Sequence, residues 1–509
     1  MTADTGASSF DLVIVGAGTA GCVLANRLSA DPDRRTLLVE AGPDYHSSAL
    51  PHDLASCADL STSHDWKYTA SAGRRNPAQP LPRARVVGGC SATNACLAVR
   101  GAPRDYDAWA AEAGGADWSY QAMLPFFRTL ENDLDFTGDH HGAGGPLPIR
   151  RYTPQEMTPF SAALLEAARA AGATPVDDHN RPGAVGAGPA PITLLGGRRT
   201  STAQGYLDPV RSRPNLVIRS RTAVDRVLTH RGVARGVRLV SGEVIPAGVV
   251  VLAAGAYSSC AILLRSGIGP AAELSRLGIA PAVDLPGVGR NLQDHTGLSL
   301  RWSAPVTAPM EPRYQVLVTA ADPQGRPDEV ALHLIGACTG TTGEGRAEAF
   351  VSVRVMRTLS RGRVRLAGRD PALPPVVEPC YFDHPEDLRL LREGLGHAYR
   401  ITGAAPLRDR FDATPRPGPA LLEDPALLER HVNRSSSGYH HPVGTCRMGE
   451  DPRSGAVTDW AGRVHGVADL RVCDASVMPV IPSGNTALPT IAVAERMAHL
   501  WLRGPGGLR

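Results

Sequence analysis

The segment that most constrains the fold lies near the start of the chain. A short apolar run, Phe10 to Val15, leads into the turn Gly16-Ala-Gly-Thr-Ala-Gly21, and a helix-like segment, Cys22 to Ser29, follows it. A second apolar run, Thr36 to Val39, ends at Glu40. A strand, a glycine-rich turn, a helix and a second strand in this order are typical of a dinucleotide-binding unit. The sequence therefore predicts an α/β fold with a Rossmann-like domain.

The chemistry of this turn suits a pyrophosphate. Gly16 permits the tight turn, Gly18 lets the backbone approach the phosphates, and Gly21 lets the helix pack closely on the strand. The N-terminus of the helix that follows offers free N–H groups, and Thr19 and Ala20 of the turn are expected to meet the cofactor beside it. Glu40 lies about 20 residues further on, where a carboxylate accepts from a ribose 2′-hydroxyl. A carboxylate there argues against a 2′-phosphate, so the turn favours FAD or NAD over NADP.

Length and pattern predict more than one domain. A chain of 509 residues is too long for one compact core. Apolar runs at Val249 to Ala254 and at Leu470 to Cys473 look like further strands of the nucleotide-binding sheet, so that domain must be discontinuous. The first run leads into a helix-like segment, Ser259 to Arg265. We expect residues 1–300 and 436–509 to form the nucleotide-binding region.

The intervening sequence has a different hydrophobic pattern. Alternating runs such as Glu329 to Leu334, Phe350 to Val355 and Arg363 to Leu366 are typical of an antiparallel sheet with one covered face. We expect residues 301–435, with about 151–206, to form a second domain of largely antiparallel sheet plus helices that covers the cofactor and binds substrate.

Composition excludes several classes of function. A net charge of +3 without a basic run makes nucleic acid a poor partner. Nine cysteines without metal-ligand spacing predict no metal site, and they predict reduced thiols in a cytoplasmic protein. No run of about 18 apolar residues predicts a membrane span, and Met1 to Ser9 has no apolar signal core.

A second glycine loop selects FAD. The segment Arg85-Val-Val-Gly-Gly-Cys-Ser-Ala-Thr-Asn94 joins a Gly-Gly turn to small polar residues, which suits backbone laid along a pyrophosphate and a flavin. With this loop the chain resembles the glucose–methanol–choline (GMC) oxidoreductases over essentially its full length. It is most similar to choline oxidase-like and aryl- or furfuryl-alcohol-oxidising members. Besides the two loops, the resemblance rests on Arg100-Gly-Ala-Pro-Arg-Asp-Tyr-Asp107, Gly255-Ala-Tyr-Ser-Ser259 with Ser266-Gly-Ile-Gly-Pro270, Pro286-Gly-Val-Gly-Arg-Asn-Leu-Gln-Asp-His295, and the block from His441-Pro-Val-Gly-Thr-Cys-Arg-Met-Gly449 to Ser483-Gly-Asn485.

The resemblance implies an FAD-dependent oxidation of an alcohol to an aldehyde or ketone. It places the catalytic base at His441 and its partner at Asn485. An alcohol is a poor hydride donor until its proton leaves, so an imidazole near the hydroxyl is useful. Asn485 could donate to the developing alkoxide and orient the carbon–hydrogen bond toward flavin N5.

The resemblance also implies the surroundings of the cofactor. Relatives that hold flavin covalently carry a histidine where this chain has Thr93, so we expect non-covalent FAD. Asp474 would meet the ribitol chain and Val224 the adenine. The full expected set is Gly16, Gly18, Thr19, Ala20, Gly21, Glu40, Ala41, Arg85, Val87, Gly88, Gly89, Cys90, Asn94, Ala95, Val224, Ala254, Gly255, Asp474, Ala475, Asn485 and Thr486.

Three residues are expected to form the substrate pocket. Tyr439 could narrow the pocket, stack on an aromatic substrate or simply pack. His440 should lie on the opposite side of a strand from His441 and support it. Gln315 aligns loosely with a glutamate of the choline-oxidising members, which makes choline a poor candidate.

Other readings remain open. Some family members cleave cyanohydrins with FAD as a structural element, so a hydroxynitrile-lyase-like activity is one alternative. A tailoring oxidoreductase for a large biosynthetic intermediate is another. The electron acceptor is oxygen, a quinone or another carrier, and the sequence does not select among them. It does not indicate the oligomeric state either.

Overall fold

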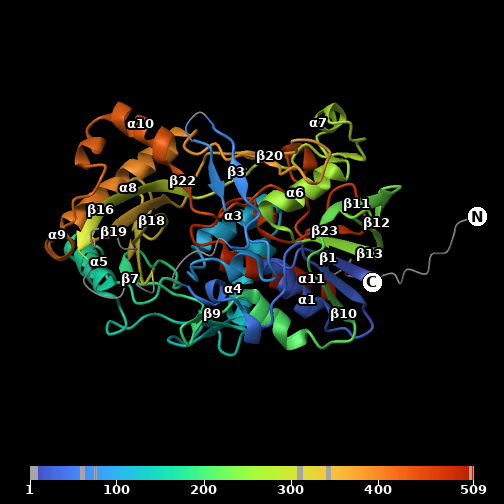
Figure 1. Ribbon diagram of the computed structural model, residues 1–509, viewed down its shortest axis with the longest axis horizontal. Helices are drawn as coiled ribbons and strands as arrows, with labels where there is room; N and C mark the ends of the chain where they lie inside the picture. Colours follow the sequence, from blue (N-terminus) through green and yellow to red (C-terminus); the bar gives the residue numbers. More distant parts are fainter. Residues whose placement is uncertain are drawn as a thin grey trace, which may run out of the picture.

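The computed structural model describes residues 10–57, 63–73, 75, 77–305, 313–339, 346–503 and 507. The polar segment Met1 to Ser9 lies outside the described residues. Two sheets form the two ends of the molecule, and the chain passes between them several times (Figure 1). The α/β fold class predicted from the sequence is confirmed.

The first sheet contains the predicted Rossmann-like unit. Its central strands run parallel, with Val15 opposite Val39 on one side and opposite Leu252 on the other. These strands are apolar and buried, as in parallel sheets covered on both faces. The strand order is β10 (Leu216–Arg219), β2 (Thr36–Val39), β1 (Phe10–Val15), β13 (Val244–Leu252), β12 (Val233–Leu239) and β11 (Val224–His230), and β23 (Leu470–Val472) also pairs with β13.

Helices from both ends of the chain cover this sheet. The last helix, α11 (Ala487–Arg503), packs against α1 (Thr19–Leu28) and α4 (Tyr120–Leu130). Helix α6 (Gly255–Arg265) packs on β11. Strand β23 and helix α11 therefore join the sheet that begins at residue 10, so segments from both ends of the described chain build this half of the molecule.

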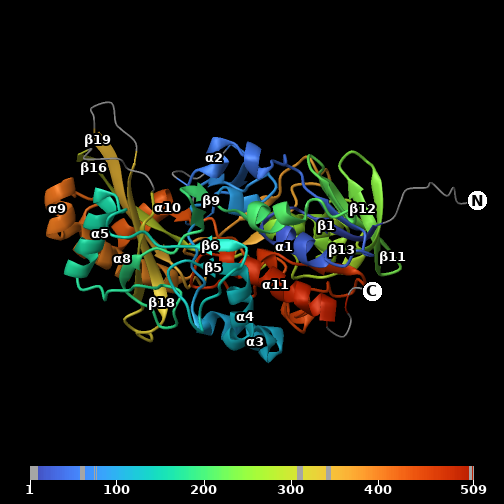
Figure 2. The same cartoon turned by 90° about the horizontal axis from the view of Figure 1, so that it is seen from below.

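The second sheet is antiparallel throughout. Helices α5 (Pro159–Ala170), α8 (Pro385–Gly403) and α9 (Ala405–Phe411) lie on its outer side, away from the first sheet (Figures 1 and 2). Alternate residues of β19, Val351, Val353 and Val355, are buried in the apolar core that these helices share with the sheet. Helix α10 (Pro425–Ser435) adds Leu428 and Val432 to the same apolar core. The order is β22 (Ser437–Gly438), β16 (Thr296–Pro305), β19 (Arg346–Val355), β18 (Val330–Thr339), β17 (Val316–Ala321) and β7 (Ala187–Pro189).

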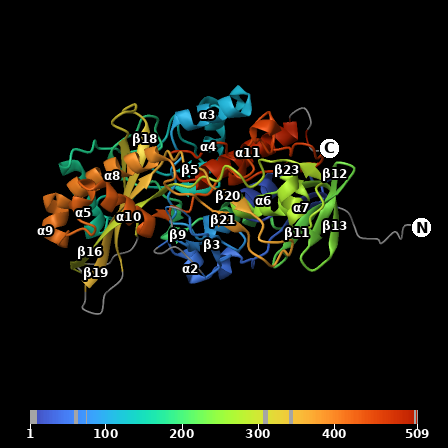
Figure 3. The same ribbon diagram turned by 90° about the horizontal axis from the view of Figure 1, so that it is seen from above.

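Smaller elements connect the two ends, most of them near the middle of the molecule in Figure 3. One sheet joins β20 (Arg363–Arg365), β21 (Val376–Glu378), β3 (Tyr68–Ala70) and β4 (Gln79–Leu81), so the run predicted at 363–366 does not belong to the second domain's sheet. The remaining helices and strands are α2 (His52–Ala55), α3 (Pro103–Ala113), α7 (Ala271–Arg276), β5 (Glu131–Asp133), β6 (Leu147–Ile149), β8 (Leu194–Leu195), β9 (Arg198–Arg199), β14 (Ile268–Gly269) and β15 (Val283–Asp284). Within the described residues, no helix is long and apolar enough to cross a membrane.

Candidate active site

A cavity of about 990 Å³ runs from the first sheet to the inner face of the second. Its walls include both glycine loops, the end of β2, the turn before α6 and the segments around residues 440 and 485. Most residues expected at the site line this cavity: Gly16, Gly18, Thr19, Ala20, Glu40, Ala41, Arg85, Gly89, Cys90, Asn94, Ala95, Val224, Ala254, Gly255, Tyr439, His440, His441, Asp474, Ala475, Asn485 and Thr486.

Three of the expected cofactor residues lie behind the cavity wall. Val87 is buried in the core, and its N–H donates to Pro43 O at 3.0 Å. Gly88 N donates to Ala17 O at 2.8 Å and so joins the second glycine loop to the first. A Cβ at Gly21 would lie 1.8 Å from Gly16 O, because α1 packs directly on the turn. These positions shape the loops, and the prediction that Val87 and Gly88 face the cofactor is corrected.

The predicted place of Gln315 in the substrate pocket is also corrected. Its side chain is fully buried, with Oε1 accepting from Thr158 N at 2.7 Å and Nε2 donating to Glu156 O at 3.0 Å. It anchors the start of α5 and does not line the cavity. The argument against choline that rested on Gln315 therefore fails.

Two carboxylates stand at strand ends on the cavity wall. Glu40, after β2, accepts from Ala17 N at 3.0 Å and from Gly42 N at 2.8 Å. Its burial raises its pKa to about 7 against these hydrogen bonds. Asp474, after β23, accepts from Gly255 N at 2.8 Å and from Ser259 Oγ at 2.6 Å. A carboxylate has about four acceptor positions, so both groups retain capacity for a ligand hydroxyl.

These features fit FAD. The cavity passes open backbone at Gly18, where a Cβ would meet no atom nearer than 3.8 Å. It continues to Asn485, whose Oδ1 is buried without a hydrogen-bond partner in the described structure. A site with a phosphate turn at one end and an unpaired amide oxygen at the other suits an elongated dinucleotide and a polar substrate.

At the far end, three side chains form a linear arrangement. Asn485 Nδ2 lies 3.2 Å from His441 Nε2. His441 Nδ1 lies 2.9 Å from His295 Nδ1, and His295 Nε2 lies 3.0 Å from Pro482 O. The two imidazole rings are perpendicular, with centroids 5.1 Å apart.

This arrangement fixes the tautomer of His441. Pro482 O can only accept, so His295 Nε2 must carry a hydrogen. Burial lowers the pKa of His295 to about 3, so its ring is neutral and its Nδ1 is an acceptor. His441 Nδ1 must then donate. Burial, followed by the neighbouring His295, holds the pKa of His441 well below its usual value, so Nε2 is an acceptor and faces the donor Asn485 Nδ2.

Asp294, the residue before His295, holds the backbone of His441. Asp294 Oδ1 accepts from His441 N at 2.8 Å, and its Oδ2 accepts from Tyr381 Oη at 3.1 Å. A Cβ at Gly438 would lie 2.5 Å from Asp294 Oδ2 and 2.2 Å from Tyr381 Oη. Glycine at 438 is therefore required for β22 to approach this carboxylate.

His440 differs from expectation. Strand β22 ends at Gly438, and His440 takes a left-handed backbone conformation with φ +64°. This turn places both His440 and His441 on the cavity wall, so strand alternation does not separate them. Arg83 Nη2 holds the turn by donating to His440 O at 2.8 Å.

The polar residues at the end of the 286–295 motif, to which the sequence assigned no role, position the segments around His441 and Asn485. Gln293 donates to Pro479 O at 2.9 Å and accepts from Ile481 N at 3.1 Å, so it fixes the approach to Asn485. Asp294 and His295 hold His441. A run of polar residues at the start of a buried strand was the signal that could have identified them.

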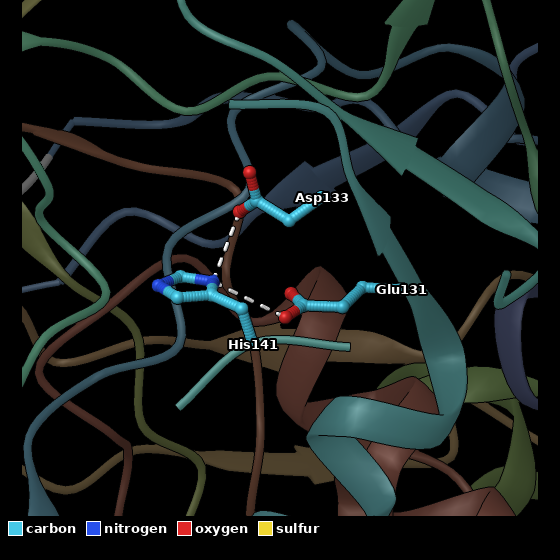
Figure 4. A group of neighbouring side chains, drawn as sticks. All are labelled: Glu131, Asp133 and His141. Carbon is cyan, nitrogen blue, oxygen red and sulfur yellow. Dashed lines mark ion pairs between the residues drawn. The ribbon is translucent and has the colours of Figure 1, made fainter. Parts of the chain in front are cut away.

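A second cluster of buried ionisable groups lies outside the cavity. Glu131, Asp133 and His141 have ligand atoms within 4.8 Å of one another, an arrangement that could hold a metal ion (Figure 4). Arg151 Nη1 lies 2.6 Å from Asp133 Oδ1, and Arg100 pairs with Glu131. Asp178 contacts both His141, at 3.0 Å, and Arg151, at 3.0 Å.

The charges of this cluster balance without a metal ion. Three buried carboxylates face two guanidinium groups, and a protonated His141 supplies the third positive charge. A fourth carboxylate, Asp135, lies 3.7 Å from Arg151 but is exposed to solvent. Burial opposes this protonation, but the contacts with Asp133, Asp178 and Glu131 outweigh it and raise the pKa of His141 to about 10. We regard the cluster as an internal ion network.

The fold and the cavity fit a flavin-dependent oxidoreductase, and comparison with known proteins gives the family. Models of the GMC oxidoreductase N- and C-terminal regions match residues 10–297 and 358–494. The chain therefore belongs to the GMC oxidoreductase family, and it is an FAD-dependent enzyme that oxidises alcohols.

Individual relatives match along nearly the whole chain. A 5-(hydroxymethyl)furfural oxidase from Methylovorus sp. is 40% identical, over 96% of this chain and 98% of the relative. An alcohol dehydrogenase [acceptor] from Pseudomonas putida is 32% identical, over 97% and 96%. The crystal structure of a pyridoxine 4-oxidase from Mesorbium loti superposes with a TM-score of 0.89 at 31% identity, covering 97% of this chain and 99% of that one.

Proposed function

We propose that this enzyme oxidises a primary alcohol with His441 as the base and Asn485 as the residue that orients the substrate oxygen. The observation that carries the proposal is the hydrogen-bonded series Asn485–His441–His295, which leaves His441 Nε2 as a neutral acceptor on the cavity wall. A base is useful at neutral pH only while unprotonated, and the lowered pKa of His441 meets that condition.

The protein's part in the reaction follows from these atoms. His441 Nε2 takes the proton of the substrate hydroxyl, and His295 stabilises the imidazolium through the Nδ1 hydrogen bond. Asn485 Nδ2 donates to the oxygen as negative charge develops on it. Bound FAD supplies the hydride acceptor.

FAD would be held by backbone and by hydrogen bonds, without a covalent link. The first turn and Gly89 would receive the pyrophosphate, Glu40 a ribose hydroxyl, and Asp474 the ribitol chain. Thr93, which lines the cavity, has no nucleophilic nitrogen to bond a flavin. Denaturation followed by ultrafiltration should release intact FAD into the filtrate.

The cavity favours a planar, ring-bearing alcohol. Tyr439, Tyr314 and Phe350 line it, and Tyr439 lies 4.5 Å from His441 between ring centroids. The Methylovorus relative is named for a hydroxymethyl group on a furfural, which agrees with this shape. We propose the cytoplasm as the compartment, supported by nine cysteines that are all unpaired.

The first test is anaerobic reduction of the purified holoenzyme. Ring-bearing primary alcohols should bleach the visible flavin band, and admission of air should restore it if oxygen is the acceptor. His441→Ala should slow the bleaching by about 1,000-fold. A quinone that restores the band where air does not would identify a dehydrogenase.

The control is His440→Ala, which removes the neighbouring imidazole but not the proposed base. Bound flavin that no alcohol bleaches would contradict the proposal and favour a lyase or a large specialised substrate. Equal losses in both variants would contradict the role given to His441.

A further inference from the structure

The substrate end of the cavity contains a buried cation, Arg354, that has no direct ion-pair partner within the described residues. Arg354, on β19, lines the cavity and is 9% exposed. In the described part of the chain it forms no ion pair, whereas Arg301 on the same cavity wall pairs with Glu348. An unpaired buried charge is costly, so its persistence in a cavity points to a charged ligand.

The free edge of the guanidinium group can be identified. Nη1 donates to Ser437 O at 2.9 Å, to Ser437 Oγ at 3.0 Å and to Gly438 O at 3.4 Å. Nε is buried without an acceptor, and Nη2 has no hydrogen bond within the described residues. Nε and Nη2 are adjacent donors on one edge, which is a geometry that a carboxylate accepts in two parallel bonds.

Sheet geometry places this edge on the substrate side. Phe350, Ser352 and Arg354 alternate along β19 and all line the cavity, while the residues between them face the helices. Across the sheet, Ser299 and Ile335 are both register partners of Ser352 and also line the cavity. Along this face of β19 the next carboxylate, Glu348, is six residues away, or roughly 20 Å along the strand. Asp294 also acts electrostatically on Arg354, but its two oxygens accept from His441 N and Tyr381 Oη.

Tyr439 connects this cation to the base. The Arg354 guanidinium lies 5.2 Å from the centre of the Tyr439 ring, and that ring lies 4.5 Å from His441. A substrate whose hydroxyl meets His441 and whose ring lies along Tyr439 would therefore carry its opposite end toward Arg354.

We propose that Arg354 binds a carboxylate, so the preferred substrates are hydroxymethyl compounds that carry a carboxylate across a small ring. This inference rests on the proposed function and specifies its substrate class. The same cation disfavours a quaternary ammonium substrate. Choline is therefore a poor candidate because of Arg354, although not because of Gln315.

The test compares two alcohols that differ in one charge: 4-(hydroxymethyl)benzoate and its methyl ester. The wild-type holoenzyme should have a kcat/KM at least tenfold higher for the carboxylate. Arg354→Met should lower kcat/KM for the carboxylate by about 30-fold or more, mainly through KM, and change that for the ester by less than about threefold.

Two further measurements separate substrate binding from support of the strand. Ser437→Ala removes one acceptor of Nη1 and should keep the preference for the carboxylate. Benzoate, which cannot be oxidised, should perturb the flavin spectrum of the wild type at concentrations at least tenfold lower than those needed with Arg354→Met. The conservative variant Arg354→Lys should recover part of the binding.

The outcomes are distinct. Equal losses for both alcohols in Arg354→Met, or a wild type that prefers the ester, would overturn the carboxylate site while leaving alcohol oxidation intact. If neither alcohol nor any other bleaches the flavin, the proposed function itself fails, and benzoate binding then tests Arg354 alone.

Discussion

His295 and His441 form one unit, since the tautomer of His441 is defined only through its hydrogen bond with His295. Pro482 O fixes the hydrogen of His295, and His295 in turn fixes the hydrogen of His441. The tautomer of the proposed base, His441, is therefore specified by a backbone carbonyl on the far side of His295.

This dependence predicts different results for two amide variants of His295. His295→Asn places an amide near the position of Nδ1, and His295→Gln places one near the position of Nε2. The asparagine variant can still accept from His441, so it should keep most of kcat, whereas His295→Gln should lose about 100-fold.

The measurement is kcat from stopped-flow flavin reduction across pH 5 to 9. A structural role alone would lower thermal stability in both variants without moving the pH profile. In contrast, loss of the tautomer should change the acid limb of the profile in the glutamine variant only. Equal kcat in both would contradict the role of the Nδ1 hydrogen bond.

Single residues also show where sequence reasoning succeeds. Gly16, Gly21 and Glu40 were placed correctly in the fold because backbone geometry and strand ends follow local rules. The cavity position of Gln315 was wrong because its alignment rested on no motif, and Arg354 was missed because its significance depends on an absent partner. Burial and ion pairing are tertiary properties that no local pattern reports.

At the scale of elements, the ion network joins the end of α4 and β5 to two loops. Arg100 also donates to His140 O at 2.6 Å, and Asp178 accepts from Asn180 N at 2.9 Å. Asn180 Nδ2 then donates to Ala98 O at 2.9 Å, near the second glycine loop. The network therefore supports the cavity wall from behind.

Removal of the His141 imidazole from this ion network should strongly destabilise the fold. His141→Gln should lower the free energy of unfolding by about 3 kcal/mol near pH 6, because it leaves uncompensated buried carboxylates. The effect has a defined pH dependence. The folded pKa of His141 is raised, so its contribution is complete below its unfolded pKa of about 6.5 and disappears as pH rises through about 10.

Thermal unfolding of both proteins between pH 6 and 10 measures this difference. The gap between wild type and His141→Gln should narrow steadily across the range. His140→Gln, one residue earlier, is the matched control and should unfold like the wild type, since only the His140 backbone contacts Arg100. A gap that is constant with pH would show that His141 is neutral in the fold.

Element boundaries followed the sequence closely in the parallel sheet and less closely elsewhere. Strands β1 and β2 match the predicted ranges because buried parallel strands are short apolar runs between turns. The hairpin of β11 and β12 was not predicted, since its residues alternate with arginines on an exposed face. The strand at 363–365 was assigned to the wrong sheet because pairing depends on distant residues.

At the scale of the molecule, the cavity extends from the first sheet to the second, so cofactor binding should stabilise both. FAD at about 1,000 times its Kd should add about 4 kcal/mol to the free energy of unfolding of the apoprotein. At the same concentration, ADP, which occupies the glycine turn alone, should add less to the free energy of unfolding. Riboflavin lacks the phosphates and should add least.

Differential scanning fluorimetry of the apoprotein with each ligand measures this order. Equal stabilisation by ADP and FAD would indicate that the flavin end of the cavity contributes no binding energy. Riboflavin that matched FAD would contradict the assignment of the first glycine turn to the pyrophosphate.

The closing of the first sheet by β23 has a consequence for synthesis on the ribosome. Strand β1 emerges long before β23, which pairs in the same sheet, and before α11, which packs on α1. The antiparallel sheet and its helices are complete in the nascent chain before β23 emerges. The second sheet and its helices can therefore fold before the first sheet is complete. The apolar strands of the first sheet stay exposed until β23 and α11 arrive, so we expect this half of the molecule to depend most on chaperones.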